Sequence, residues 1–283
     1  MPILVDYSQV FIANIMQQPG VHVTGEVEED LIRHMVLNSL RSYRVKYSET
    51  YGELVICCDS KNNWRREIYP QYKAGRKKGR ESSHLNWSSI YTAIDKIKNE
   101  ISDNFPYKVI AAEQSEADDI IAVLCEYYEG KEKILILSGD KDFVQLQKYS
   151  GVEQWSPVQK KYVTTDDPLM YKKEHILKGD KGDGVPNFLS PDNTFVDGLR
   201  QKPLQRKKID SWLGLKPELF CDHQMLAGYH RNKSMVDLDC IPERIKEKIM
   251  ENYLILEDIG RSKLFNYFIQ YKLKNLMEKI QEF

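Results

Sequence analysis

The stretch from 133 to 143 joins an apolar strand to two acidic residues. Leu137 is followed by Ser-Gly and then by Asp140 and Asp142, with one lysine between them. Carboxylates at the carboxyl end of a strand lie where α/β sheets usually bind ligands. Two acids this close repel each other unless a proton or a cation neutralises them. The pair therefore indicates a cation site, although a turn would also explain it by itself.

The order of strand and then acid recurs in the chain. The apolar run 3–5 leads into Asp6, and the run 54–58 leads into Asp59. A third group, Glu116, Asp118 and Asp119, stands in the first turn of a predicted helix. Acids at this position also interact favourably with the helix macrodipole, so capping alone could account for the group. A fourth group, Asp180 and Asp183, has a three-residue spacing that points both side chains in the same direction.

These nine acids come from five segments, and a parallel sheet would bring its strand ends together at one edge. Oxygen ligands without histidine or thiolate suit Mg²⁺ or Mn²⁺ rather than zinc. Two such ions about 4 Å apart are a recurrent device for phosphodiester hydrolysis. The acids therefore predict a metal site that acts on phosphodiesters.

A basic segment follows shortly after Asp59. Between 61 and 80 there are eight basic residues and one acid, interleaved with Trp64, Tyr69 and Tyr72. A solvated charged loop is one interpretation. The mixture of aromatic and cationic side chains is also the one that grips single strands by stacking and phosphate contacts. A second basic cluster, from Arg200 to Lys208, adds to the evidence for a polyanionic ligand.

The elements that must position these residues alternate between strand and helix. Apolar periodicity predicts strands at 2–5, 53–58, 107–112 and 133–137, an edge hairpin at 152–164, and helices at 28–46, 87–101 and 116–128. Ser115 is the expected N-cap of the last of these helices. The alternation predicts an α/β fold with a mostly parallel central sheet flanked by helices.

Strand signals fade after about residue 170. Helical patterns at 171–178, 208–212, 242–252 and 262–283 predict a smaller C-terminal helical domain. We therefore expect a core at 1–170, with the basic segment at about 61–85, and a helical domain at 171–283. The helical domain would contribute Asp180 and Asp183.

Composition bounds the class of protein. The chain has 283 residues, 41% of them hydrophobic and 29% charged, which suits a globular protein with a full core. No apolar run has the length of a membrane span, and the five cysteines and six histidines show no zinc-ligand spacing. The short apolar start lacks the basic region of a signal peptide, so a cytoplasmic location and no membrane partner are expected.

Four motifs together resemble the structure-specific 5′ nuclease family, which includes flap endonucleases and the 5′ nuclease domain of bacterial DNA polymerase I. They are Tyr72-Lys73-Ala74-Gly75-Arg76, Glu116-Ala117-Asp118-Asp119, Ser138-Gly139-Asp140-Lys141-Asp142-Phe143 and Gly179-Asp180-Lys181-Gly182-Asp183. The likeness is strongest to the ribonuclease H branch of T-even phages. It covers nearly the whole chain and implies a PIN-like nuclease core.

The resemblance also implies roles for single residues. Asp6, Asp59, Glu116, Asp118 and Asp140 would build a first metal site, and Asp142, Asp180 and Asp183 a second, with Asp119 as an outer carboxylate. The basic segment would form a helical arch in which Tyr72 stacks on the terminal base while Lys73 and Arg76 bind the scissile phosphate. Further nucleic-acid contacts would come from Arg65, Arg66, Lys77, Lys78, Arg80, Lys178, Lys181, Arg206, Lys207 and Lys208.

The function implied is that of a monomeric phage replication enzyme in the host cytoplasm. It would be a 5′ to 3′ exonuclease with ribonuclease H and flap endonuclease activity, using two Mg²⁺ ions that Mn²⁺ can replace. Its substrates would be RNA–DNA hybrids and flap or forked DNA. A single-stranded-DNA-binding protein or a sliding clamp is a candidate partner, with 276–283 as a candidate contact.

The family pattern is not complete. The run 184–191 lacks a second glycine-rich turn, which family members use to hold duplex phosphates. Two other functions compete. A haloacid-dehalogenase-type phosphatase needs a second aspartate two residues after its nucleophile, but Ser8 stands there after Asp6. The second is a catalytically inactive nucleic-acid binder on the same fold. The full set of acids argues against it, because acids without bound cations would repel phosphate.

Overall fold

The computed structural model describes residues 2–256 and 260–283, apart from the side chains of His22 and Val23. Six strands form one sheet in the order β3-β2-β1-β4-β5-β6. Strands β1 to β5 run parallel, and β6 pairs antiparallel with β5. The strands are β1 (Pro2–Asp6), β2 (Glu53–Cys57), β3 (Lys108–Ile110), β4 (Ile134–Leu137), β5 (Val152–Ser156) and β6 (Lys161–Val163). The predicted α/β class, the mostly parallel sheet and the edge hairpin are therefore confirmed.

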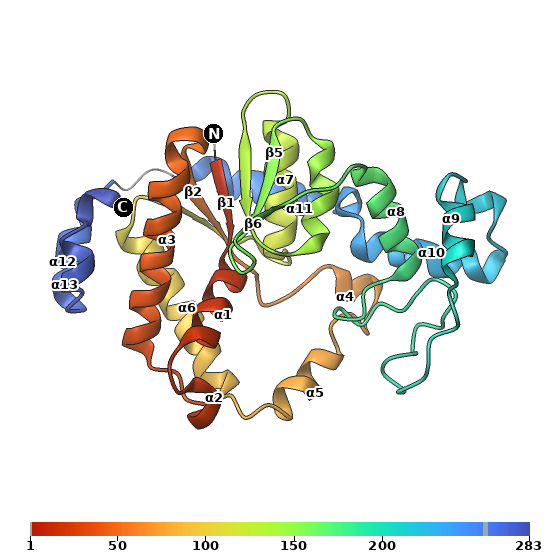
Figure 1. The fold of residues 1–283 in the computed structure, drawn as a ribbon, viewed down its shortest axis with the longest axis horizontal. Helices are drawn as coiled ribbons and strands as arrows, with labels where there is room; N and C mark the ends of the chain where they lie inside the picture. Colours follow the sequence, from red (N-terminus) through yellow and green to blue (C-terminus); the bar gives the residue numbers. More distant parts are fainter. Residues whose placement is uncertain (1, 257–259) are drawn as a thin grey trace.

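Helices cover both faces of the sheet (Figure 1). The α-helices are α1 (Tyr7–Gln17), α2 (Val21–Thr24), α3 (Glu29–Tyr51), α4 (Arg65–Ile68), α5 (Gly75–Glu81), α6 (Trp87–Asn104), α7 (Ala117–Tyr128), α8 (Pro168–Lys178), α9 (Arg206–Leu213), α10 (His223–Val236), α11 (Glu243–Ile255), α12 (Leu264–Gln270) and α13 (Lys274–Met277). The 3-10 helices are η1 (Lys141–Lys148), η2 (Pro217–Leu219), η3 (Leu238–Cys240) and η4 (Ile280–Glu282). Helices α1 and α10 were not predicted from the sequence, and the predicted helix 262–283 is broken into three short pieces.

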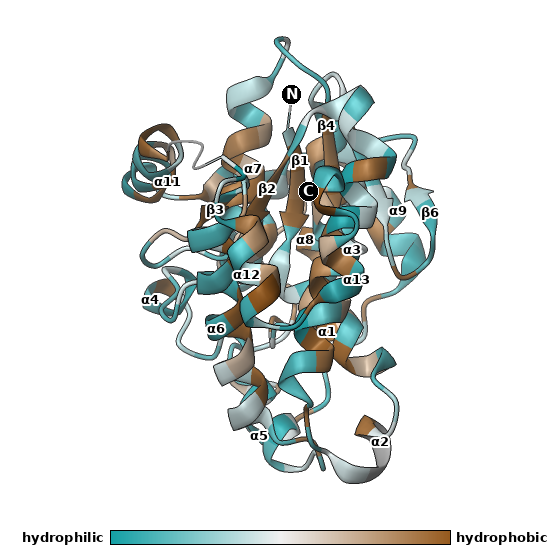
Figure 2. Ribbon diagram, turned by 90° about the vertical axis from the view of Figure 1, so that its left-hand side faces the viewer, coloured by the Kyte–Doolittle hydropathy of each residue, from teal (hydrophilic) through white to brown (hydrophobic). Residues whose placement is uncertain are grey.

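Alternate residues of the strands point into two different cores. In β1, Ile3 and Val5 pack with α1, α3 and α6, whereas Leu4 packs with α7 and α11 on the other face. This alternation follows from the two-residue period of a strand. In Figure 2 the strands β1, β2 and β4 are largely brown, as expected for strands covered on both faces. The strand ends are thus held rigidly from both sides, which fixes the acids that follow them.

The segment after residue 170 packs in three separate places. Helices α8, α9 and α10 form a small lobe that shares a hydrophobic cluster with Tyr69 and Tyr72 (Figure 1). Helix α11 instead covers the sheet beside α7, and α12 and α13 lie beside α3. Among the described helices, none is both long and apolar enough to cross a membrane. A two-part division at 170 stays a prediction.

The last residues of the chain are part of the core. Phe283 is fully buried, and its ring lies 5.6 Å from that of Phe105, while Leu276 is 2% exposed. A partner contact through 276–283 would require these side chains to be accessible. That prediction is wrong for Leu276 and Phe283, because both side chains are already buried in the core of the protein.

Candidate active site

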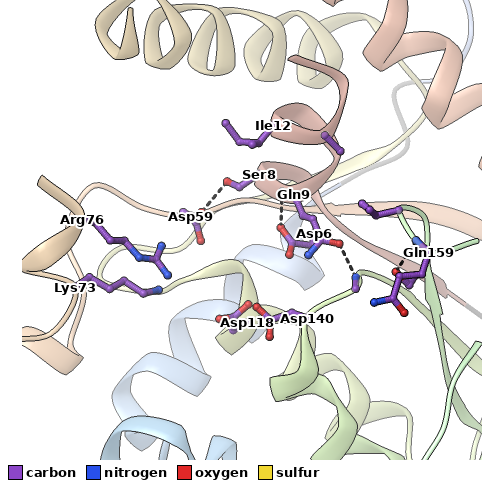
Figure 3. A pocket seen from close by; sticks show the side chains of 14 residues that line it. Asp6, Ser8, Gln9, Ile12, Asp59, Lys73, Arg76, Asp118, Asp140 and Gln159 are labelled. Atoms are coloured by element: carbon purple, nitrogen blue, oxygen red, sulfur yellow. Dashed lines mark hydrogen bonds between the residues drawn. The ribbon is translucent and has the colours of Figure 1, made fainter. Parts of the chain in front are cut away.

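Four acids converge on one cavity at the carboxyl edge of the sheet. The cavity, of about 530 Å³, is lined by the cavity acids, a name used here for Asp6, Asp59, Asp118 and Asp140. Lys73 and Arg76 line it from the arch side, as Figure 3 shows. Asp6 ends β1, Asp59 follows β2, and Asp140 follows β4, so that parallel pairing alone brings three of them together. Asp118 comes from the first turn of α7.

Local hydrogen bonds fix the orientation of these carboxylates. Asp6 is the N-cap of α1 and accepts from the Gln9 N–H at 3.0 Å and from the Ser138 hydroxyl at 3.2 Å. Asp59 accepts from the Ser8 hydroxyl at 2.7 Å and from the Ala117 N–H at 2.9 Å (Figure 3). Helix α1 thus begins at one cavity acid and supplies the hydroxyl that positions another.

The cavity acids are also electrostatically strained. Burial, together with the charge of Asp59, raises the pKa of Asp6 to about 7. Burial likewise raises the pKa of Asp118 well above its ordinary value, with Glu116, Asp140 and Asp6 adding repulsion that Lys73 partly offsets. Within the described residues no cavity acid has a basic side chain within salt-bridge distance. Such a donor set fits a divalent cation, because a cation removes this repulsion.

Four further acids, the flanking acids Glu116, Asp142, Asp180 and Asp183, do have cationic partners. Glu116 Oε1 lies 2.5 Å from Lys73 Nζ, and its Oε2 lies 3.2 Å from Arg65. Asp183 lies 2.5 Å from Arg76 and 3.6 Å from Lys73. Although burial opposes ionisation of Glu116, the charges of Lys73 and Arg65 prevail and lower its pKa to about 2.

His175 is a side chain near the site that the sequence did not single out. It lies on α8 between two flanking acids, with Nδ1 3.2 Å from Asp142 Oδ1 and Nε2 3.5 Å from Asp180 Oδ2. The structure therefore places a histidine beside acids that were expected to act without one. The sequence could not reveal this contact, because His175 is five residues before Asp180 and only the turn at Gly179 brings the two side chains together.

Asp119 and Arg65 form a buried pair that faces away from the cavity. Asp119 is fully buried and accepts from the Trp64 indole, from the Glu116 N–H and from both terminal nitrogens of Arg65. Arg65 is 2% exposed and also donates to the Met235 carbonyl oxygen. Their placement contradicts a nucleic-acid contact for Arg65, because its guanidinium is committed to protein oxygens. Asp119 acts through Arg65 and Glu116, not as a group that lines the cavity.

The start of α7 also differs from its prediction. Its N-cap is Glu116, which makes a capping box with Asp119, and the Ser115 hydroxyl donates to the Ala112 carbonyl oxygen at 2.8 Å instead. Glu116 and Asp119 cap the helix, whereas Asp118 lines the cavity. Capping therefore accounts for two of the three acids, and the metal role of the group stays a prediction.

The arch crosses the open side of the cavity. Its chain leaves β2, passes through α4 and α5, and returns to α6 at Asn86, whose N–H donates to the Gly25 carbonyl oxygen at 3.0 Å (Figure 1). Lys73 has the left-handed φ of 57°, and its N–H donates to the Asp183 carbonyl oxygen at 2.7 Å. A strained backbone of this kind persists only where its surroundings hold it, and it occurs often at functional sites.

The other predicted nucleic-acid residues are placed as follows. Tyr72 is 3% exposed, and its hydroxyl lies within hydrogen-bond distance of two carboxylates, Glu116 at 2.9 Å and Asp183 at 2.8 Å, so in this conformation it cannot stack on a base. Arg80 is half-buried near the Tyr91 ring, and Lys178 and Arg206 both pair with Glu174. The remaining six are exposed: Arg66, Lys77, Lys78, Lys181, Lys207 and Lys208.

The fold is shared with solved structures of phage T5 proteins. The phage T5 D15 protein, solved with metal ions, superposes with a TM-score of 0.63 at 15% identity and covers 90% of this chain and 99% of that one. A T5 D15 flap endonuclease complex with DNA and metal ions gives a TM-score of 0.61 at 16% identity, covering 89% of this chain and 97% of that one. At such identities the likeness concerns the fold.

Sequence comparison defines the family. Residues 10–177 match the model of the 5′-3′ exonuclease N-terminal resolvase-like domain, and residues 166–283 match the C-terminal domain of T4 RNase H. Ribonuclease H of Enterobacteria phage T4 is 32% identical over 99% of this chain and 95% of its own. Flap endonuclease Xni of Shewanella loihica is 24% identical over 71% of this chain and 70% of its own. The chain therefore belongs to the 5′-3′ exonuclease family, with the C-terminal domain of the T4 RNase H type.

Membership confirms the predicted enzyme class, a 5′ nuclease that hydrolyses phosphodiesters. It disfavours the phosphatase alternative, in agreement with Ser8 at the position where that chemistry needs an aspartate. Divalent metal ions occur in the related structures, and the carboxylates described above are suited to hold them.

Proposed function

We propose that this chain removes RNA primers and adjacent DNA from lagging-strand fragments as a phage replication nuclease that uses two Mg²⁺ ions, with Mn²⁺ able to replace them. The observation that carries the proposal is the meeting of the four cavity acids with Lys73 and Arg76 around one cavity (Figure 3). An inactive nucleic-acid binder would gain nothing from four carboxylates without basic partners, because they repel phosphate.

The residues present fit the metal ions. Asp6, Asp59, Glu116, Asp118 and Asp140 would hold the first ion, and Asp142, Asp180 and Asp183 the second. When bound, such ions activate a water molecule and stabilise the charge of the in-line transition state. Asp140 and Asp142 belong to neighbouring groups, because Asp140 lines the cavity while Asp142 faces His175. The one-residue separation of this pair would set the two sites side by side.

The arch supplies the positive charge that the phosphate needs. Lys73 and Arg76 reach the cavity, where they can neutralise charge on phosphate oxygens. In the structure they pair with Glu116 and Asp183. A substrate phosphate must therefore exchange with these carboxylates, and binding of metal ions to the same carboxylates would free the two cations for that exchange. Lys73 and Arg76 would thus offset the charge that builds on the scissile phosphate, and the acids would hold the ions.

The substrate class follows from the relatives. A ribonuclease H and flap endonucleases are among them, which supports RNA–DNA hybrids and flap or forked DNA as substrates. The exposed cations of the arch and of α9 are placed to bind backbone phosphates. We further propose a monomer in the host cytoplasm, a C-terminal helical domain that binds duplex, and a single-stranded-DNA-binding protein or sliding clamp as partner.

The decisive experiment compares cleavage by the wild type, Asp140→Asn and Asp166→Asn. The substrates are a 5′-labelled RNA–DNA hybrid and a flapped duplex, with Mg²⁺ or EDTA. Asp140→Asn should slow cleavage by roughly 10³-fold, because a metal ligand contributes several kcal/mol to the transition state, while substrate binding stays largely intact. Asp166 is exposed and distant from the cavity lining, so Asp166→Asn should match the wild type. Undiminished cleavage by Asp140→Asn would refute the mechanism.

A further inference from the structure

His175, Asp142 and Asp180 form a compact cluster beside the cavity. One ligand atom from each of the three residues lies within 4.8 Å of the others. Each ring nitrogen of His175 faces a different carboxylate, at 3.2 Å for Asp142 and at 3.5 Å for Asp180. No other group of three or more potential ligand side chains is this close within the described part of the chain. The cluster thus stands out from the 42 acids of the sequence.

The fold holds this cluster in place from several elements. Asp142 begins η1, whose N-cap is Asp140, and its N–H donates to Asp140 Oδ1 at 2.9 Å. His175 lies one turn before the end of α8, with its ring at the edge of Tyr171. The side chain of His175 is only 14% exposed. Its position is therefore set by the packing of α8 and is not that of a free surface histidine.

The turn after α8 returns Asp180 toward His175. Gly179 has a φ of 67°, and a Cβ there would lie 2.5 Å from the Pro186 carbonyl oxygen, so only glycine fits. Asp180 Oδ1 accepts from the Asp183 N–H at 3.0 Å, which leaves Oδ2 directed at His175. The carboxylate is thus oriented by its own turn, independently of any ligand.

These distances suit a metal ion as well as they suit ion pairs. Neighbouring ligands about 2.1 Å from an octahedral centre, the geometry of Mg²⁺ and Mn²⁺, are roughly 3.0 Å from one another. The separation of 3.5 Å between His175 Nε2 and Asp180 Oδ2 is close to this, so a small shift would place both atoms around one ion. A metal-bound histidine commonly keeps its second ring nitrogen against a carboxylate, and Asp142 Oδ1 is in that position while its other oxygen would remain for the ion. The two carboxylates supply the negative charge that a divalent ion requires.

We infer that His175 donates a ring nitrogen to the second metal ion of this nuclease and thereby raises the affinity of that position for Mn²⁺ and similar transition metals relative to its affinity for Mg²⁺. The inference rests on the proposed two-metal function and goes beyond it in naming a nitrogen ligand. Imidazole suits first-row transition ions, whereas Mg²⁺ prefers oxygen and gives up its water reluctantly. The first position, built from carboxylates alone, has no such preference.

Electron paramagnetic resonance of bound Mn²⁺ tests the inference without relying on activity. Tag-free wild-type protein should bind two Mn²⁺ ions, and echo modulation should show ¹⁴N coupling from one ligand nitrogen. His175→Gln should lose the coupling and bind one ion roughly 10-fold more weakly or worse, with a matching loss of preference for Mn²⁺ over Mg²⁺. His230→Gln is the matched control, since His230 is exposed on α10 and should leave both measurements unchanged.

The outcomes separate the two proposals. Two bound Mn²⁺ ions without ¹⁴N coupling, or coupling that survives in His175→Gln, would overturn the role of His175 and leave the two-metal function standing. A single bound ion that shows coupling lost in His175→Gln would support the role of His175 and contradict the two-ion count. Absence of any bound Mn²⁺ in the wild type would refute both. Thermal melting of His175→Gln confirms that the variant is folded.

Discussion

The cavity acids and the flanking acids meet different neighbours, although both sets lie at the same edge of the sheet. Among the cavity acids, Asp6, Asp59 and Asp140 accept from hydroxyl or amide donors, and all four line the same cavity. Every flanking acid has a basic side chain within 4 Å. The sheet therefore builds one half of the site at an electrostatic cost, whereas the arch and α8 give the acids of the other half basic partners, although burial still raises the pKa of Asp142 to about 7.

This difference indicates how the two halves can work. The cavity acids are ready for a cation, because their repulsion favours any ion that enters. Of the flanking acids, Glu116 and Asp183 must first exchange Lys73 and Arg76 for a metal ion. The cations released in this way are the ones that the phosphate would need. An enzyme organised like this holds its basic residues close to the site before substrate arrives.

The largest effects should come from neutralising one acid of each kind. Asp118→Asn and Asp180→Asn should both reduce cleavage by roughly 10³-fold, since both remove a metal ligand. Without metal, the two substitutions should shift the melting temperature in opposite directions. Asp118→Asn should raise the melting temperature in EDTA, because it removes a charge that burial disfavours. Asp180→Asn should lower it, because the hydrogen bond with His175 depresses the pKa of Asp180 and favours its charged form.

The sign follows from linkage. Asp118 binds a proton more tightly in the folded than in the unfolded protein, so its contribution to stability falls as the pH rises above the unfolded pKa. In mildly alkaline buffer the charged form therefore destabilises the fold, and the asparagine is expected to stabilise it by about 1 kcal/mol or more. Melting temperatures that shift in the same direction for both variants would break the distinction between cavity and flanking acids.

The next largest effect concerns the stability of the buried pair of Arg65 and Asp119 beside the flanking acids. Arg65→Met should lower the free energy of unfolding by about 3–5 kcal/mol, because Asp119 would be left as a buried charge without its partner. Arg66→Met changes the neighbouring, exposed arginine and should stay within about 0.5 kcal/mol of the wild type. Urea denaturation measures both. Equal losses for the two variants would show that Arg65 is not a structural residue.

The smallest effect separates chemistry from affinity in the arch. Lys73→Met should slow single-turnover cleavage by roughly 10²-fold, because one preorganised cation is lost from the transition state, with little change in substrate affinity. Lys77, whose side chain is 80% exposed, supplies the control. Lys77→Met should leave the cleavage step unchanged and weaken binding slightly, in a salt-dependent way. A defect of Lys73→Met confined to affinity would refute its place in the chemistry.

Much of the fold could be read from local patterns. The strands β1, β2, β3 and β4 and the helices α3, α6 and α7 appear where two-residue and helical periodicities place them. Helix α10 escaped prediction because one of its buried positions is polar: Asn232 donates to the carbonyl groups of Ile176 and Pro186. A helix whose inner face is partly polar leaves no clear apolar period.

The site shows the same division. That Asp6, Asp59, Asp118 and Asp140 would meet was determined by the sequence itself, because each follows a strand or begins a helix, and parallel strands bring these ends together. Only the tertiary structure decided which charged side chains are buried in ion pairs and which are exposed. Arg65 and Arg66 are neighbours of the same type, yet one is buried against Asp119 and the other is exposed. His175 gained its two carboxylates in the same way, since charge pairing depends on distances between segments far apart in the chain, and no local pattern records them.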